Sequence, residues 1–147
     1  MTTTAQYVGK VTPQIYIGLG GGGARMVSRL YDHFHDNPWW RKVRDESTAF
    51  VVVDTNKGDL DKLASREDMT TILLRSHGDW ASEYGRSDPF LDHFLGNMLP
   101  RSTVEGAGQI RREARTKLYF SEQIVVSAIE SALDKVLDDG NDFLSFE

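Results

Sequence analysis

The stretch that decides the fold is Ile15-Tyr16-Ile17-Gly18-Leu19-Gly20-Gly21-Gly22-Gly23-Ala24-Arg25-Met26-Val27, where glycine fills five of the six positions 18–23. A short apolar run precedes the glycines and an apolar pattern at helical spacing follows them, which predicts a strand, a glycine loop and a helix. The predicted buried stripe of this helix consists of Met26, Val27, Leu30, Tyr31 and Phe34. Glycine suits a backbone that another group approaches closely, and the amides at a helix N-terminus favour an anion. We therefore expect this segment to bind a phosphate.

The glycine spacing narrows the class of phosphate site. Gly18, Gly20 and Gly23 fit the pattern G-x-G-x-x-G, with the strand before it and the helix after it that nucleotide binding requires. The Lys-Ser/Thr pair of a Walker-type P-loop is missing, which argues against that class. The alternative is a tight strand-to-helix turn without a ligand. Such a turn explains one or two glycines better than five.

The length and composition predict one soluble globular domain. The chain has 147 residues, 39% of them hydrophobic, and its net charge of −5 argues against nucleic-acid binding. It has no cysteine, which excludes disulfides and thiolate metal sites. No apolar run is long enough to span a membrane and the N-terminus has no export signal, so we expect a cytoplasmic protein without a membrane partner. Residues 1–14 should form a flexible tail and residues 15–147 the domain.

A second apolar run, Ala49-Phe50-Val51-Val52-Val53-Asp54, is typical of a parallel strand that is covered on both faces. It ends in Asp54, Thr55 and Asn56, at the edge where parallel sheets bind ligands. These side chains could contact sugar hydroxyls or a hydrated cation, or they could cap the next turn, and the sequence leaves both roles open. A short helix over residues 60–63 and a strand over residues 70–74 should follow.

The rest of the chain offers a second anion-binding candidate. Residues 75–105 predict a long, partly helical excursion, and its scattered acids and histidines match no metal site. The last long helix should begin at residue 106, with Arg111, Arg112 and Arg115 in its first turns. Cations are unfavourable at that end of a helix, so they should face an anion, unless they are chance surface charge. The core stripe predicted for this helix consists of Leu118, Val125, Ile129, Leu133, Val136 and Leu137. A fourth strand should begin at Asp142.

Three motifs together resemble the tubulin/FtsZ superfamily, most closely its bacterial tubulin-like branch. They are residues 18–30, Val53 to Asn56 with Leu60, and residues 106–108 with Arg115. The resemblance implies an incomplete GTPase domain, with a three-layer, Rossmann-like parallel sheet flanked by helices. It also implies GTP or GDP, with Mg²⁺, as the ligand, and filaments in which hydrolysis is completed across a subunit contact. The implied nucleotide contacts are Gly18, Gly20, Gly21, Gly22, Gly23, Ala24, Arg25, Asp54, Thr55, Asn56, Gly106, Ala107, Gly108, Arg112 and Arg115.

The chain also departs from that family's pattern. Ala24 and Arg25 stand where FtsZ usually has Gly and Asn, and Asp54 and Asn56 are exchanged relative to its Asn-Thr-Asp. The G-G-G-T-G-[ST]-G loop, the base-reading helix and the acidic assembly loop are absent, so we assign no catalytic residue and expect weak GTP binding without hydrolysis. The alternatives are an NAD(P)- or FAD-binding oxidoreductase domain and a non-catalytic interaction module. The oxidoreductase pattern places an acid roughly 20 residues after the glycines, earlier than Asp54.

Overall fold

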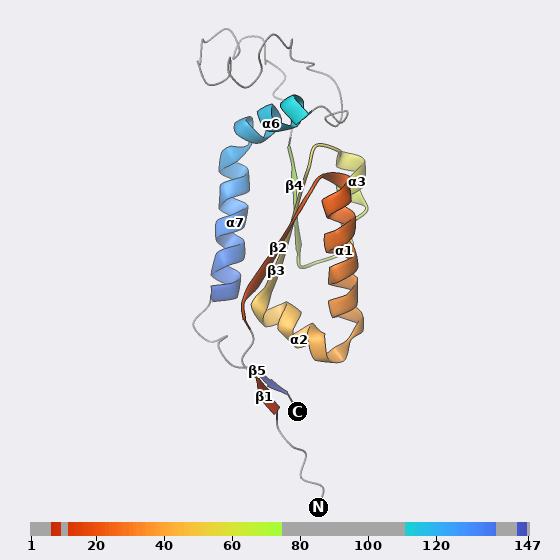
Figure 1. Cartoon of the computed structure of the whole chain (residues 1–147), viewed down its shortest axis with the longest axis vertical. Coiled ribbons are helices and arrows are strands. Elements are labelled where there is room, and N and C mark those ends of the chain that lie inside the picture. The colour runs from red at the N-terminus through yellow and green to blue at the C-terminus, as the bar shows by residue number, and fades with distance from the viewer. Residues whose placement is uncertain (1–6, 10–11, 75–110, 138–143, 147) are drawn as a thin grey trace, which may run out of the picture.

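The computed structural model describes residues 7–9, 12–74, 111–137 and 144–146 and shows an α/β fold (Figure 1). The elements are β1 (Tyr7–Gly9), β2 (Gln14–Leu19), α1 (Gly20–Asp36), α2 (Pro38–Ser47), β3 (Thr48–Asp54), α3 (Lys57–Asp61), β4 (Met69–Leu73), α6 (Arg111–Phe120), α7 (Glu122–Leu137) and β5 (Leu144–Phe146). The excursion predicted over residues 75–105 lies outside the described residues.

The central feature is a parallel sheet with the strand order β2-β3-β4. In its register Phe50 of β3 lies between Tyr16 of β2 and Met69 of β4. Every residue of β3 is buried, because strands flank both of its edges and helices cover both faces of the sheet. Figure 1 shows α1 and α7 on opposite sides of the sheet. The predicted three-layer α/β architecture is therefore confirmed.

One face of the sheet packs against α1. Val27, Tyr31 and Phe34 are buried there beside Phe50, and the Tyr31 and Phe50 rings lie 5.4 Å apart between centroids. The predicted stripe is wrong at Met26, which is 75% exposed, while Ala24 is buried instead. The buried positions 24, 27, 31 and 34 recur at intervals of three and four residues, and position 26 lies outside that stripe.

The other face packs against α7. The buried cluster on this side contains Ala49, Val51, Val53, Ile72, Leu74, Ala132 and Val136. The stripe predicted for the single C-terminal helix is wrong at Leu118, in α6, and at Leu133 and Leu137, in α7, which are 43%, 40% and 61% exposed. The helix instead turns Ala128 and Ala132 toward the sheet, and these small side chains bring its backbone close to the strands.

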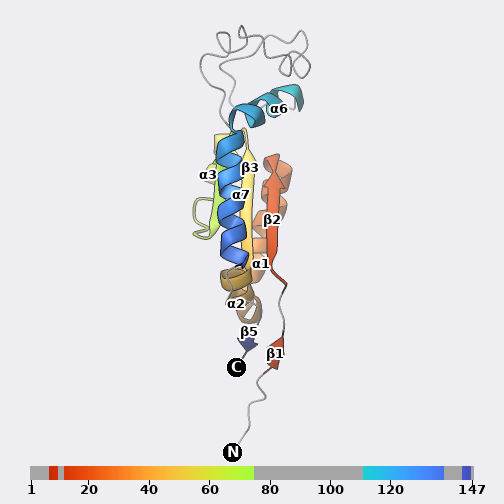
Figure 2. The ribbon, with the colours of Figure 1, turned by 90° about the vertical axis from the view of Figure 1, so that its left-hand side faces the viewer.

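The predicted single C-terminal helix is divided into α6 and α7 at Ser121. The Ser121 N–H donates to the carbonyls of both Lys117 (3.1 Å) and Leu118 (3.0 Å), a shared hydrogen bond that is common at helix ends. In Figures 1 and 2 α6 leans across the end of α7 and turns toward the carboxyl ends of the parallel strands. Among the described helices, none has the length and apolar character needed to cross a membrane.

Helix α2 was not predicted from the sequence. Pro38 does end α1, but it is also the first residue of α2, a position where the missing proline N–H breaks no hydrogen bond. Arg44 of α2 is buried, with Nη1 2.7 Å from Nδ1 of His35 and Nη2 2.6 Å from the Asp45 carboxylate. Its guanidinium also lies 5.1 Å from the centre of the Tyr31 ring. These contacts fix α2 against the end of α1.

A second, antiparallel sheet pairs the two ends of the chain. Tyr7 of β1 aligns with Phe146 of β5. The strand expected after Asp142 is therefore present, but it joins β1 and, within the described residues, no strand of the parallel sheet. Strand β1 and Gln14, the first residue of β2, lie within the segment expected to be a flexible tail. In Figures 1 and 2 the C-terminal end of α7 lies at the end of the molecule where β2 begins. Strands β1 and β5 therefore meet at that end.

Candidate functional site

A cavity of about 400 Å³ opens at the carboxyl ends of β2, β3 and β4. The residues that line this strand-end cavity are Leu19, Gly20, Gly21, Val53, Asp54, Thr55, Leu74, Ala114, Arg115 and Leu118. Parallel α/β sheets bind their ligands at this edge. The structure thus brings together five of the predicted contacts, Gly20, Gly21, Asp54, Thr55 and Arg115, from three separate motifs.

The glycines have two different roles in the structure. A methyl group on Gly18 would lie 2.7 Å from the Gly23 carbonyl oxygen, and one on Gly23 would lie 2.8 Å from the carbonyl carbon of Gly18. These two glycines let β2 and α1 pack closely. By contrast, a methyl group on Gly20 or Gly22 would meet no atom of the described chain within 4 Å. The open side of the segment is therefore at Gly20 and Gly22.

The predicted glycine loop is shorter than expected, because residues 20–23 already form the first turn of α1. Gly20 has φ 66°, a left-handed conformation that glycine adopts without strain. No side chain caps this end of α1, and its first turn has no acidic residue. The positive end of a 17-residue helix therefore faces the strand-end cavity with its amide donors uncapped by side chains.

Asp54 is the buried acid of the strand-end cavity and is 6% exposed. Its Oδ1 accepts hydrogen bonds from the backbone N–H groups of Thr55 (2.6 Å) and Asn56 (3.0 Å). Its Oδ2 is buried and has no hydrogen-bond partner in the described chain. This oxygen lies 3.9 Å from the methyl position on Gly21. Because an unpaired buried carboxylate oxygen is costly, Oδ2 is suited to accept from a ligand or to bind a cation.

Asn56 fulfils the capping role that the sequence left open. Its Oδ1 accepts from the N–H of Gly58 at 2.9 Å, and its Nδ2 donates to Asp59 at 3.3 Å. These contacts fix the first turn of α3, and Asn56 lines neither of the two cavities described here. Of the three predicted polar contacts after β3, only Asp54 and Thr55 therefore line the strand-end cavity.

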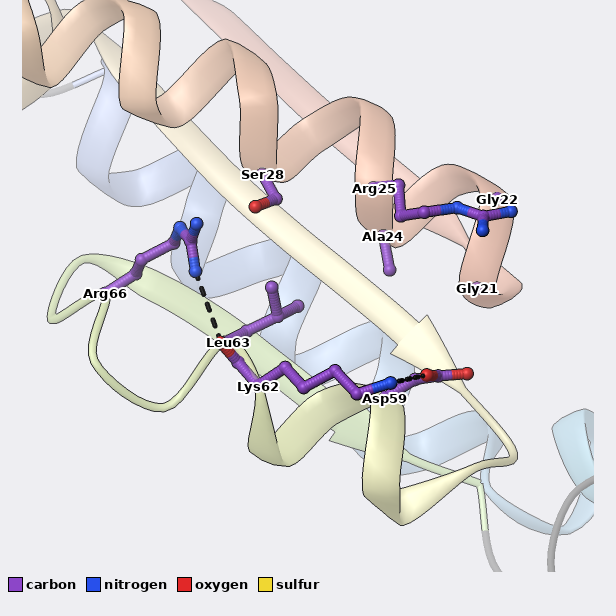
Figure 3. Close-up of a pocket in the computed structure, with 9 residues that line it drawn as sticks. All are labelled: Gly21, Gly22, Ala24, Arg25, Ser28, Asp59, Lys62, Leu63 and Arg66. Carbon is purple, nitrogen blue, oxygen red and sulfur yellow. Dashed lines mark hydrogen bonds and ion pairs between the residues drawn. The ribbon is translucent and has the colours of Figure 1, made fainter.

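A second cavity, of about 380 Å³, lies between α1 and α3 (Figure 3). The residues that line this α1/α3 groove are Gly21, Gly22, Ala24, Arg25, Ser28, Asp59, Lys62, Leu63 and Arg66. Ala24 and Arg25 were predicted as nucleotide contacts, and the structure places them in this groove and not among the strand-end residues. Gly21 lines both cavities, so the two adjoin at the first turn of α1.

Two of the three cations in the groove are already paired. Lys62 Nζ lies 2.7 Å from Asp59 Oδ1. Arg66 donates to both carboxylate oxygens of Asp32, from Nε at 3.0 Å and from Nη2 at 2.8 Å. These hydrogen bonds raise the pKa of the Arg66 guanidinium, although partial burial opposes the shift. Arg25 forms no ion pair within the described part of the chain.

Reasoning from the sequence missed Ser28 and the groove residues contributed by α3 and the turn after it. The short helix predicted over residues 60–63 corresponds to α3, which begins earlier, at Lys57, because Asn56 caps its first turn. The candidates at residues 106–108, the acids and histidines of 75–105, and the Arg112 side chain lie outside the described residues. Among those described, no three histidine, aspartate or glutamate side chains form a group that could hold a metal ion.

A protein-family model described as tubulin-like matches residues 15–142, which is most of the chain. The match begins in β2, includes α7, and so contains every described residue of both cavities. No curated protein and no solved structure matches the chain. The chain belongs to the tubulin-like family.

Proposed function

We propose that this chain binds GTP at the strand-end cavity, with the phosphates over the first turn of α1. Membership in the tubulin-like family supports this proposal. So does the chemistry of the cavity, where the uncapped helix terminus and Arg115 provide positive charge for phosphates. The preference for guanine rests on the family resemblance of the sequence.

The observation that carries the proposal is the unpaired Oδ2 of Asp54. A phosphate cannot satisfy this oxygen, because two anions repel each other at such short range. A hydrated Mg²⁺ ion satisfies both groups, since its waters donate hydrogen bonds to carboxylates while the ion neutralises phosphate charge. Asp54 and Thr55 would hold the hydrated ion in this arrangement. We therefore propose that the ligand is the magnesium complex of the nucleotide.

One observation favours a second candidate, a dinucleotide such as NAD(P). Asp54 ends the parallel strand next to β2, which is where dinucleotide-binding enzymes place the acid that contacts ribose. Helix α2 accounts for the extra residues between the glycines and this acid. Against this candidate, Asp54 Oδ1 is already engaged by two backbone amides, and Arg115 in the same cavity favours a phosphate.

A titration with fluorescently labelled GTP, with and without Mg²⁺, tests the proposal. Unlabelled GTP should displace the probe, whereas ATP and NADH should displace it poorly. In Asp54→Asn the affinity gained from Mg²⁺ should fall about tenfold, because a charge-assisted contact is lost. Asp61→Asn is the matched control, since Asp61 is exposed, pairs with Lys57 and lines neither cavity.

Three results would contradict the proposal. Better displacement by NADH than by GTP would favour the dinucleotide candidate. Equal Mg²⁺ dependence in Asp54→Asn and the parent chain would remove the role assigned to Asp54. Failure to bind any of the nucleotides would favour a non-catalytic interaction module.

We also propose that the tubulin-like protein assembles into filaments when GTP is bound. This proposal rests on family membership and on the family resemblance of the sequence. Sedimentation and light scattering with GTP and with GDP provide the test. Assembly should require GTP, and equal sedimentation with both nucleotides would contradict the proposal.

A further inference from the structure

We propose that Arg25 contacts the terminal phosphate of the bound triphosphate and thereby favours GTP over GDP. This inference rests on the proposed function, because it assumes that the phosphates lie over the first turn of α1. It assigns to the α1/α3 groove the end of the phosphate chain that a diphosphate lacks.

The two cavities offer a continuous path for a phosphate chain. Both are lined by Gly21, and the space beside Gly22 is free of described atoms within 4 Å of its methyl position. A phosphate chain that starts beside Arg115 in the strand-end cavity can therefore extend over the open side of Gly20 and Gly22 into the groove. Figure 3 shows the Arg25 side chain extended along α1 toward Gly22.

An acid, Asp59, lies at the boundary between the cavities, on the side of Gly21 that faces α3. Asp59 Oδ2 lies 3.1 Å from the methyl position on Gly21. Its charge is offset by Lys62, at 2.7 Å from Oδ1, and its Oδ2 accepts a hydrogen bond from Asn56. The negative charge of Asp59 is therefore partly offset on the α3 side, and Arg25 adds positive charge on the α1 side.

The placement of Arg25 is unfavourable for the isolated helix. It lies in the second turn of α1, near the positive end of the helix dipole, and Arg29 follows at the i+4 position on the same exposed face. Neither arginine forms an ion pair within the described residues. Of the cations that line the groove, Lys62 and Arg66 are already paired with acids, which leaves Arg25 to pair with an added anion.

The test compares the affinities for GTP and GDP in two matched variants, Arg25→Gln and Arg29→Gln. In Arg25→Gln the affinity for GTP should fall about tenfold, as for one lost charge-assisted contact, while the affinity for GDP stays unchanged. Arg29 lines neither cavity, so Arg29→Gln should leave the ratio of the two affinities unaltered. Arg25→Lys, which keeps the charge but loses the planar fork, should give an intermediate ratio.

The outcomes separate this inference from the proposed function. Equal losses for GTP and GDP in Arg25→Gln would overturn the inference, because they would indicate a general electrostatic effect. An equal shift in the ratio for Arg29→Gln would overturn it as well. If the parent chain bound neither nucleotide, the proposed function itself would fail. Circular dichroism of each variant checks folding, which should be retained because both side chains are exposed.

Discussion

Two alanine substitutions within the glycine segment should change stability in opposite directions. In Gly18→Ala the new methyl group would lie 2.7 Å from the Gly23 carbonyl oxygen, 2.8 Å from its carbon and 2.9 Å from Val27 Cγ2. Two of these atoms are backbone, so the contact is relieved only if β2 and α1 move apart. In Gly22→Ala the methyl group enters open space in a helical turn.

The expected difference between the two variants is large for one methyl group. Overpacking a close contact costs about 1–3 kcal/mol, and here the neighbours are backbone atoms, so we expect the upper end for Gly18→Ala. Replacing a helical glycine by alanine stabilises by up to about 1 kcal/mol, which we expect as the limit for Gly22→Ala. The two free energies of unfolding should therefore differ by about 3 kcal/mol.

Urea unfolding followed by circular dichroism measures this difference. For a small domain the free energy falls by about 1–3 kcal/mol per molar urea, so the midpoints should be separated by about 1–3 M. Gly22→Ala should unfold at or above the midpoint of the parent chain. If Gly18→Ala were as stable as Gly22→Ala, the close approach of β2 and α1 at Gly18 would be refuted.

Four further predictions concern the surroundings of the two cavities. Asn56→Ala should lower the free energy of unfolding by about 1 kcal/mol, measured in urea, because it removes the cap of α3. Gly20→Ala should lower it by about 1–2 kcal/mol in the same assay, because a residue with a Cβ is strained at φ 66°. Arg66→Lys loses the two-pronged contact with Asp32, and thermal unfolding should show a loss of less than about 1 kcal/mol at this partly exposed site. The pKa of Arg66 is raised, so its contribution is complete below the ordinary pKa of a guanidinium and is lost only above the raised one, both far above neutral pH. The difference between Arg66→Lys and the parent chain should therefore stay constant from about pH 7 to about pH 9.

The strand-glycine-helix segment and the buried strand β3 could be predicted because local pattern and tertiary role agree there. Val51 and Val52 are fully buried, as an uninterrupted β-branched run indicates. Helix α2 was missed because a proline after a helix can be followed by a loop or by a second helix. The contacts of Arg44 with His35 and Tyr31 of α1, which hold α2 in place, cannot be seen in the local sequence. The buried stripe predicted for the C-terminal helix was partly wrong, because the prediction placed the most hydrophobic residues, the leucines, in the core. In the structure the helix packs closely on the sheet through the small residues Ala128 and Ala132.

The candidate site was predictable where it lies on strand ends. Parallel strands bring their carboxyl ends to one edge, so Gly20 and Asp54 could be grouped from the sequence. Arg115 lies on α6 and was added through the cations at the start of the predicted helix and through the family resemblance. The α1/α3 groove could not be predicted, because it depends on how α3 packs beside α1. The fixed position of Arg66 likewise depends on Asp32, which is 34 residues away in the sequence.

We propose that the phosphates of GTP lie over the first turn of α1 in the strand-end cavity. A titration of the ¹⁵N-labelled chain with GTP and Mg²⁺, followed by amide chemical shifts, tests it directly and tolerates weak binding. The largest shifts should occur at Gly20, Gly21, Gly22 and Thr55, with smaller ones at Arg115. Largest shifts in β1 and β5 or on α7, or no shifts at saturating GTP, would contradict the claim.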